Sequence, residues 1–424
     1  MNKQILRIAI PSIVTNITVP LLGMVDLSIA GHIGAASVIG AISVGGLIFN
    51  MVYWLFNFLR MGSSGLTAQA FGREDGRDER RVLRMALGVA FSCGLLIFCL
   101  QRPIEWAAHL VVAPTDEVWA LATAYFRIRV WAAPAVLALF ALNGWFVGMQ
   151  NSRYPMYIAI GQNLLNIVAS ALLVFGCHMG IEGIALGTVI SQYAGLLAAL
   201  VFVRLTPLHS TMQSSATQVS ASDFFTVNRD IFLRMICLIA VTTAFTSLGA
   251  RQGELLLAVN TLLIQLFILF SYFCDGFALA GEALVGKFVG ANDGVQKLAC
   301  TRRLFVWAGG VVLLFTLLYG VGANVVLRIL TDNAEVIAQA QPYLPWVLLI
   351  PVTGFAAFMW DGIFIGATAT RQMLCTLAFG AAVFFIVWLL PLPLSPNHHL
   401  WLSFILYLSA RSLIQTLLAK QVLK

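Results

Sequence analysis

One carboxylate stands alone in the first hydrophobic segment of the chain. Asp26 is the only formally charged residue between Ile8 and Ile33, in a stretch long and apolar enough to cross a bilayer as a helix. An ionised carboxylate at the centre of a bilayer costs about 2.5 to 3.5 kcal/mol on insertion scales. Asp26 should therefore be protonated, paired or exposed to a water-filled cavity, and each of these arrangements favours a role in transport.

Amides and hydroxyls recur in other hydrophobic segments of the first half of the chain. Asn163, Asn166 and Ser170 are spaced i, i+3 and i+7, so they share one helix face. Such a face must turn toward other helices. Its amides can serve simply to join helices by hydrogen bonds, each of which stabilises the contact by well under about 2 kcal/mol. Beside a lone carboxylate, the set favours binding of a proton or a cation. The candidates for this coupling site are Asp26, Asn143, Asn163, Asn166, Ser170 and Thr188.

Three further carboxylates, Asp275, Glu282 and Asp361, lie within hydrophobic sequence of the second half. Asp275 and Asp361 occur in the similar settings D-G-F and D-G-I-F, whereas Glu282 is close enough in sequence to Lys287 to pair with it. Ionisable residues inside a membrane usually mark a path for an ion or a substrate. The three carboxylates are therefore candidates for contact with a cation or the substrate in the second half.

Neither an enzyme nor a metal or cofactor site is predicted. The sequence has no H-E-x-x-H motif, and its seven cysteines are scattered without C-x-x-C spacing. The six histidines fall in predicted loops or at the ends of predicted spans. The expected partners are small molecules, H⁺ or Na⁺, and the lipid bilayer.

The composition defines the kind of protein that must position these groups. The chain is 60% hydrophobic and only 10% charged, with a mean hydropathy of +0.90, which is typical of a surface that faces lipid. Twelve hydrophobic runs, each long enough to span a bilayer, occur between about Ile5 and Leu418. We expect an all-α polytopic membrane protein, with no nucleic-acid partner despite its net charge of +7.

The distribution of basic residues predicts the orientation in the membrane. Most of the 25 basic residues, with Arg234 and Arg411 counted among those in connections or near chain ends, fall on the side of the N-terminus. Positive-inside bias then places both termini in the cytoplasm. Arg60, Arg127 and Arg129 lie within or near spans, where they are expected to snorkel or to pair.

The chain divides into two similar halves. A polar, Ser/Thr-rich segment near mid-chain predicts a lobe of residues 1–206, a cytoplasmic linker of residues 207–229 and a second lobe of residues 230–424. At one constant offset, segments 72–76, 117–125 and 143–148 match segments 290–294, 335–343 and 361–366. Six spans per lobe is an even number, so the lobes form a parallel repeat, a geometry that suits alternating access.

The first span also carries residues that weaken a helix. Pro11 and Pro20 each remove a backbone hydrogen bond, and Gly23 loosens the turn that follows. These residues predict either a static kink or a helix that bends when Asp26 gains or loses a proton.

Several of these segments together resemble one family. They are the first span with Pro11, Asn16 and Asp26, the motifs MGSSGLTAQAFGREDG, NLLNIVAS and GIALGTVISQY, and the segment WDGIFIGATATR. Over essentially the whole chain they resemble the multidrug and toxic compound extrusion (MATE) family, and most closely its DNA-damage-inducible F (DinF) branch. The resemblance implies twelve helices in two six-helix lobes around a central cleft. It also implies drug efflux and antibiotic resistance at the bacterial inner membrane, with amphipathic or cationic compounds exchanged for H⁺ or Na⁺.

By this resemblance Asp26 corresponds to the coupling aspartate, with Asn166 and Thr188 as polar neighbours. Members of the branch often carry a second aspartate where this chain has Ser170, so a two-carboxylate relay or a carboxylate-rich Na⁺ site is not expected in this lobe. We predict a monomeric, secondary active multidrug efflux antiporter that exchanges substrate for H⁺ by alternating access, with protonation of Asp26 bending the first helix. The alternatives are a Na⁺-coupled antiporter and a flippase for lipid-linked precursors.

Overall fold

The computed structural model of the protein describes residues 1–33, 36–112, 115–209 and 219–423. Within these ranges the chain is helical and contains no β-strand. Twelve segments are long and apolar enough to cross a membrane, from Asn2–His32 at one end of the chain to Pro396–Leu423 at the other. The prediction of an all-α polytopic protein with twelve spans is confirmed.

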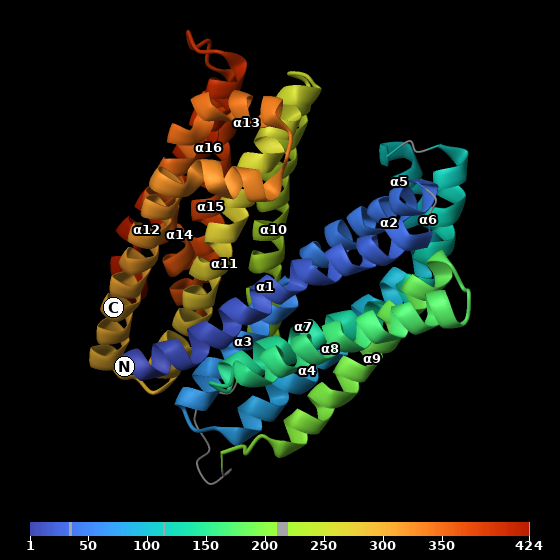
Figure 1. Cartoon of the computed structure of the whole chain (residues 1–424). Helices are drawn as coiled ribbons and strands as arrows, with labels where there is room; N and C mark the ends of the chain where they lie inside the picture. Colours follow the sequence, from blue (N-terminus) through green and yellow to red (C-terminus); the bar gives the residue numbers. More distant parts are fainter. Residues whose placement is uncertain (34–35, 113–114, 210–218, 424) are drawn as a thin grey trace. The chain divides into compact units, whose positions relative to one another are not determined.

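The first six spans come from helices that are coloured blue to green in Figure 1. These helices are α1 (Asn2–Ile33), α2 (Ala36–Leu55), α3 (Phe58–Gly72), α4 (Gly76–Cys99), α6 (Asp116–Arg129), α7 (Ala133–Gly148), α8 (Arg153–Ala171) and α9 (Ile181–Leu205). The short helix α5 (Gln101–Val112) lies between the third and the fourth span and belongs to neither. Two of the spans are built from two helices each, because α2 is followed directly by α3 and α6 by α7. A 3₁₀ turn at Val130–Ala132 separates α6 from α7, where Pro134 starts the new helix.

The last six spans come from helices that are coloured yellow-green to red in Figure 1. These helices are α10 (Ala221–Ala250), α11 (Glu254–Gly290), α12 (Gly294–Leu330), α13 (Ala334–Ala340), α14 (Leu344–Gly366), α15 (Thr370–Leu389) and α16 (Pro396–Leu423). The shortest of them, α13, precedes α14 within a single span, as α6 precedes α7 in the first half.

The chain forms two compact units whose boundaries differ from the expected lobes. One unit is Val14–Phe224, and the other combines Met1–Ile13 with Phe225–Lys424. The start of α1 belongs to the second unit because it packs on α11, where a Cβ at Gly276 would lie 2.3 Å from the side chain of Ile13. The expected linker of residues 207–229 becomes helical at Ala221, and its central part, residues 210–218, lies outside the described residues.

The internal repeat is visible in how helices approach one another. On α7, a Cβ at Gly144 would lie 2.1 Å from the carbonyl oxygen of Arg60 on α3. On α14, a Cβ at Gly362 would lie 2.0 Å from the carbonyl oxygen of Ala278 on α11. Gly362 and Ala278 follow Gly144 and Arg60 in the chain by the same constant offset that relates the matching segments of the sequence. The same glycine therefore gives the same close helix contact in each half, and the duplication is confirmed.

The turns repeat in the same way. Glu74 and Asn292 occupy the left-handed region with φ of 56° and 53°, just before the N-terminal caps of α4 and α12. At these caps the carboxylates of Asp75 and Asp293 accept hydrogen bonds from backbone N–H groups of the first turn. In each half, the motif G-x-x-D-G thus ends one helix and caps the N-terminus of the next.

Candidate functional site

Asp26 lies in the last third of α1 and is buried, with 3% of its side chain exposed. Its Oδ1 has no hydrogen-bond partner among the described residues. Two turns earlier on the same helix, the backbone carbonyl of Thr18 accepts a hydrogen bond from Nδ2 of Asn163 at 2.8 Å. Helix α8 therefore contacts the segment of α1 that leads to Asp26.

The polar face predicted on α8 meets polar side chains of α9. Nδ2 of Asn166 donates to Oγ1 of Thr188 at 3.0 Å, and Nε2 of Gln162 donates to Oε1 of Gln192 at 3.0 Å. A glycine allows this close approach, because a Cβ at Gly187 would lie 2.3 Å from Oγ of Ser170. We call this interface the α8–α9 seam; its polar residues are Gln162, Asn163, Asn166, Ser170, Thr188 and Gln192.

The α8–α9 seam keeps unused hydrogen-bonding capacity. Oδ1 of Asn166 and Oγ of Ser170 are buried without a hydrogen-bond partner in the described part of the chain. Such groups are uncommon in folded proteins and call for an explanation, such as water, a bound ion or a proton. Among the described residues, no hydrogen bond joins Asp26 to this seam or to Asn143, whose Oδ1 is also buried without a partner. The structure thus gathers four of the six expected coupling residues and places Asp26 on the helix that one of them, Asn163, contacts.

Arg129, which the sequence predicts to snorkel or to pair, lies in the same unit as Asp26. The charge of Arg129 on α6 is within electrostatic range of Asp26, and no hydrogen bond or ion pair joins the two side chains among the described residues. Its Nη1 donates to the hydroxyl of Tyr125 at 2.5 Å, and its Cζ lies 4.9 Å from the centre of the Phe49 ring. The spacing i, i+4 of Tyr125 and Arg129 was the only signal for this contact in the sequence.

The carboxylate of Asp361 in the second unit forms ion pairs with two arginines. Arg234 on α10 and Arg411 on α16 both donate to its Oδ2, and Nε2 of Gln415 donates to its Oδ1 at 2.7 Å. Arg234 and Arg411 are buried, so the assignment of these two residues to connections and chain ends was wrong. The sequence misled because a single arginine in a long helix looks the same whether it snorkels to the surface or pairs inside.

The other two carboxylates of the second half are placed on α11. The charge of Asp275 interacts with Arg234, so Asp275 belongs to the same group of charges as Asp361. Glu282 is buried about two turns before the end of α11, and its backbone carbonyl oxygen lies against Gly366 of α14. Glu282 thus lies where α11 packs closely on α14.

The remaining intramembrane arginines of the first half are paired, as expected. Nε and Nη2 of Arg127 donate to the two carboxylate oxygens of Glu105 at 2.9 and 3.1 Å. Nε of Arg60 donates to Oδ1 of Asn57 at 3.2 Å. Within the described ranges, no three histidine, cysteine or acidic side chains come together to form a metal site.

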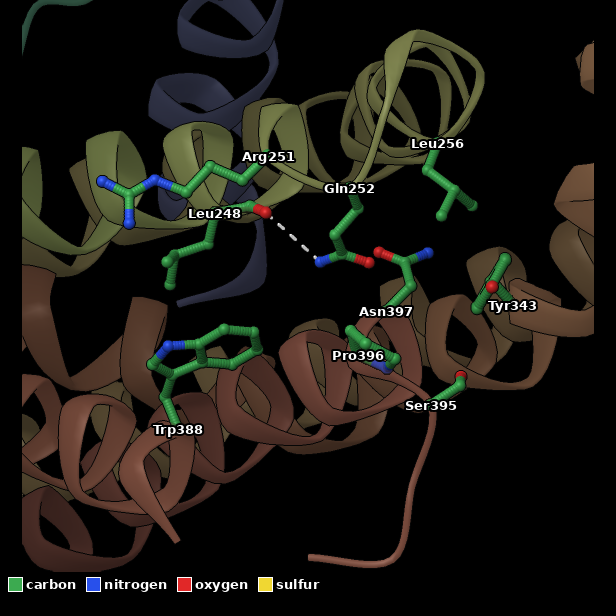
Figure 2. Close-up of a pocket in the computed structure, with 9 residues that line it drawn as sticks. All are labelled: Leu248, Arg251, Gln252, Leu256, Tyr343, Trp388, Ser395, Pro396 and Asn397. Atoms are coloured by element: carbon green, nitrogen blue, oxygen red, sulfur yellow. Dashed lines mark hydrogen bonds between the residues drawn. The ribbon is translucent and has the colours of Figure 1, made fainter. Parts of the chain in front are cut away.

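The second unit also contains a pocket of about 500 Å³ (Figure 2). Its lining residues are Leu248, Arg251, Gln252, Leu256, Tyr343, Trp388, Ser395, Pro396 and Asn397. None of the residues singled out from the sequence lines it. Behind its wall, Nε1 of Trp401 donates to Asn260 at 2.9 Å, and Asn260 donates to Oδ1 of Asn397 at 2.7 Å. This chain of amides fixes the orientation of Asn397, since an indole can only donate.

The duplicated twelve-span fold and the buried polar groups define a class of membrane transport protein. The chain belongs to the MatE family, whose model matches residues 11–172 and 231–389. It is 38% identical over 416 residues to the DNA damage-inducible protein F of Escherichia coli (strain K12), covering 97% of this chain and 90% of that protein. The predicted family is confirmed.

Two solved structures share the fold. One is described as the outward-facing conformation of a multidrug resistance MATE family transporter of the MOP superfamily; it covers 99% of this chain and 95% of its own, with a TM-score of 0.88 and 18% identity. The other is a crystal structure of MATE in the bent conformation, covering 100% of this chain and 95% of its own, with a TM-score of 0.85 and 18% identity. Proteins of this family are transporters of small molecules, so the chain is a multi-pass membrane transporter and not an enzyme.

Proposed function

We propose that the protein is a secondary active antiporter that exports amphipathic or cationic organic compounds in exchange for H⁺ by alternating access. The observation that carries this proposal is the buried carboxylate of Asp26, whose Oδ1 has no hydrogen-bond partner among the described residues. A buried acceptor of this kind gains most from binding a proton, because protonation removes the cost of holding a charge in a medium of low dielectric constant.

Protonation would also change what Asp26 can bind. An ionised carboxylate only accepts hydrogen bonds, whereas a protonated one also donates. Partners that donate to the ionised form, such as water or an amide of the α8–α9 seam, would then have to rearrange. The coupling residues of this mechanism are Asp26, Asn143, Asn163, Asn166, Ser170 and Thr188.

The bending of α1 is the response that we propose. Pro11 and Pro20 each lack the backbone N–H that would continue the helix. A Cβ at Gly23 would meet nothing within 4 Å, so this turn has room to move. Asn163 holds the helix just before Pro20, at Thr18, and a rearranged seam would release or shift this contact.

The energy available from protons is sufficient for drug export. One proton that moves down the membrane potential releases about 2.3 kcal/mol per 100 mV. Each unit of pH difference adds about 1.4 kcal/mol. Because about 1.4 kcal/mol corresponds to a tenfold concentration ratio, one proton supports a substrate gradient of a few orders of magnitude.

The substrates and the location follow from the relatives. One solved relative is described as a multidrug resistance transporter, and we extend this activity, with the resulting antibiotic resistance, to the present chain. We place the protein in the bacterial inner membrane as a monomer with both termini in the cytoplasm. Removing Arg234 and Arg411 from the count of basic residues in the connections leaves the positive-inside bias in the same direction.

The sites on the second unit have a different role in this proposal. Asp361 and Asp275 share a group of charges with two arginines, so a cation would have to displace Arg234 or Arg411 to reach them. We therefore assign a secondary role to the cation or substrate contacts of this unit, with Asp275, Glu282 and Asp361 as the candidates. The arginines are also too well paired to form a free cationic site for a pyrophosphate, which disfavours a flippase.

The test uses purified protein in proteoliposomes loaded with ethidium, a fluorescent organic cation. Efflux is measured under an imposed pH gradient or an imposed Na⁺ gradient, for the wild type, for Asp26→Asn and for Asp332→Asn as a control at an exposed carboxylate. We expect the pH gradient to drive efflux in the wild type and in the control. In Asp26→Asn we expect the rate of pH-driven ethidium efflux to fall at least tenfold. Full pH-driven efflux in Asp26→Asn, or a response of the wild type to Na⁺ alone, would overturn the proposal.

A further inference from the structure

The first turns of α4 carry a row of arginines on one side of the helix. Arg77, Arg80, Arg81 and Arg84 are spaced i, i+3, i+4 and i+7, so their side chains share one helix face. Three of them, Arg77, Arg80 and Arg84, are exposed, and Arg81 is half-buried. The first and the last are about 10 Å apart along the helix axis. We call these four residues the α4 basic face.

The acidic residues of the same turns point the other way and are already bonded. Asp78 and Glu79 are buried. Oδ2 of Asp78 accepts hydrogen bonds from Nη2 of Arg73 and from the backbone N–H of Val219, both at 3.0 Å. Oε1 of Glu79 lies 2.6 Å from Nδ1 of His209. Neither carboxylate neutralises the α4 basic face, and in the described part of the chain no ion pair involves its three exposed arginines.

The same side of α4 continues as an apolar surface. Phe91 follows Arg84 by about two helical turns, and Leu95 follows Arg77 by about five, so both lie on the side of the arginines. Their side chains are 43% and 59% exposed. The 24 residues of α4 rise about 36 Å, whereas the hydrocarbon core of a bilayer is about 30 Å thick. With Phe91 and Leu95 against the lipid chains, the arginines lie at the level of the headgroups.

The internal repeat shows that this start of a helix does not require arginines. The positions of α12 that correspond to Arg77, Arg80 and Arg81 are held by uncharged residues, namely Val295, Leu298 and Ala299. Val295 and Leu298 are 81% and 41% exposed, so they occupy the same outward side. Of the four charges on α4, only that of Arg84 has a counterpart on α12, which is Arg302. The fold common to the two halves therefore does not account for the α4 basic face.

We propose that the α4 basic face binds the headgroups of anionic phospholipids. The oxygens of a phosphodiester accept hydrogen bonds from guanidinium groups, and each arginine near an anionic membrane surface strengthens binding about fivefold. The acyl chains of the same lipid would lie along Phe91 and Leu95, so a lipid uses both parts of this side of α4, whereas a soluble anion uses only one. This inference goes beyond the proposed function, because it requires only that α4 spans a membrane.

The test measures the binding of phosphatidylglycerol to the purified, delipidated protein in detergent by native mass spectrometry. The wild type is compared with Arg77→Gln/Arg80→Gln/Arg84→Gln, in which the three exposed arginines of the α4 basic face lose their charge. We expect the dissociation constant of the most tightly bound phosphatidylglycerol to rise at least about tenfold in this variant. An unchanged dissociation constant would overturn the proposal.

Two controls separate the α4 basic face from positive charge in general. Arg153→Gln/Arg251→Gln/Arg328→Gln removes the same charge from exposed arginines of three other segments and should bind phosphatidylglycerol like the wild type. Phosphatidylethanolamine, whose headgroup is zwitterionic, should bind the wild type more weakly than phosphatidylglycerol. An equal loss in the two triple variants, or equal affinity of the wild type for the two lipids, would contradict the inference. Soluble glycerol phosphate that binds as tightly as phosphatidylglycerol would exclude a lipid as the occupant.

A variant of the other half tests the proposal by adding a site. Val295→Arg/Leu298→Arg reproduces the spacing of the exposed arginines of α4 on α12, where Arg302 is already present. We expect this variant to retain additional phosphatidylglycerol at the same lipid concentration. The result does not depend on the folding of the triple variant of α4. If the folded α12 variant retains no more phosphatidylglycerol than the wild type, the arginine spacing is not sufficient for binding and the proposal is wrong.

Discussion

The side-chain amide of Asn163 donates a hydrogen bond to the backbone carbonyl of Thr18, with a distance of 2.8 Å between Nδ2 and the oxygen. The contact ties α8 to α1 two residues before Pro20, where the helix already lacks one backbone hydrogen bond. It lies eight residues before Asp26, on the same helix. The α8–α9 seam therefore contacts α1 just before Pro20. A bend of α1 at Pro20 would move the part of the helix that carries Asp26.

Removing this contact should loosen α1. Asn163→Leu eliminates the donor to Thr18 at a cost of about 0.6 kcal/mol, the average for hydrogen bonds between membrane helices. We expect faster amide hydrogen exchange in residues 14–26, measured by mass spectrometry in detergent. Gln162→Leu, the neighbour on α8 that bonds Gln192 instead, is the control and should leave α1 unchanged. Equal exchange in both variants would show that Asn163 does not restrain α1.

Breaking the charge group of α10, α14 and α16 should destabilise the second unit strongly. Asp361→Asn leaves Arg234 and Arg411 buried without their common carboxylate, which typically costs about 3 to 5 kcal/mol. We expect a large fall in the melting temperature in detergent, and a smaller one when Arg411→Gln is added to Asp361→Asn, because the double variant buries one charge fewer. A melting temperature of Asp361→Asn equal to that of Asp332→Asn would contradict the structure.

The two glycines of the internal repeat should respond alike to substitution. A Cβ at Gly144 or at Gly362 would come within about 2 Å of a backbone carbonyl oxygen on the neighbouring helix. Gly144→Ala and Gly362→Ala should each destabilise the protein by about 1 to 3 kcal/mol, since the helices must move apart. Gly309→Ala, at a helical glycine with nothing within 4 Å of a Cβ, should be neutral or slightly stabilising. Thermal unfolding of the three variants checks this, and a milder effect at Gly144 than at Gly309 would be inconsistent with the packing.

The hydrogen-bonded side chains of Trp401, Asn260 and Asn397, beside the pocket of Figure 2, should contribute to stability in a coupled way. Asn260→Leu leaves Nε1 of Trp401 and Oδ1 of Asn397 without their partner, and each buried orphan costs about 1 to 3 kcal/mol. Asn260→Leu combined with Asn397→Leu removes one of these orphans and should recover part of the loss. A double variant that loses the sum of the losses of the two single variants would rule out coupling between the two amides. The free energy of unfolding in a denaturant titration measures both effects.

The sequence was sufficient for the architecture. Helix number and type follow from the length and composition of local stretches, which lipid enforces because every backbone group must be bonded within the helix. The duplication was readable because Gly144 and Gly362 recur with Asn143 and Asp361 at a constant spacing. The same reading put Asn166 and Thr188 on faces that the structure joins by a hydrogen bond.

The partners of the charges were decided only by the tertiary structure. Arg234 and Arg411 looked like residues of connections, yet both pair with Asp361, from which they are 127 and 50 residues distant in the chain. Arg129 was expected to snorkel or to pair, and the structure places it over the ring of Phe49 on another helix. Sequence spacing fixes which residues share a helix face, but which faces meet depends on how helices pack, through contacts such as that of Gly45 on Tyr125. Asp26 itself was evident from the sequence, whereas its burial, with Oδ1 lacking a partner among the described residues, emerged only from the fold.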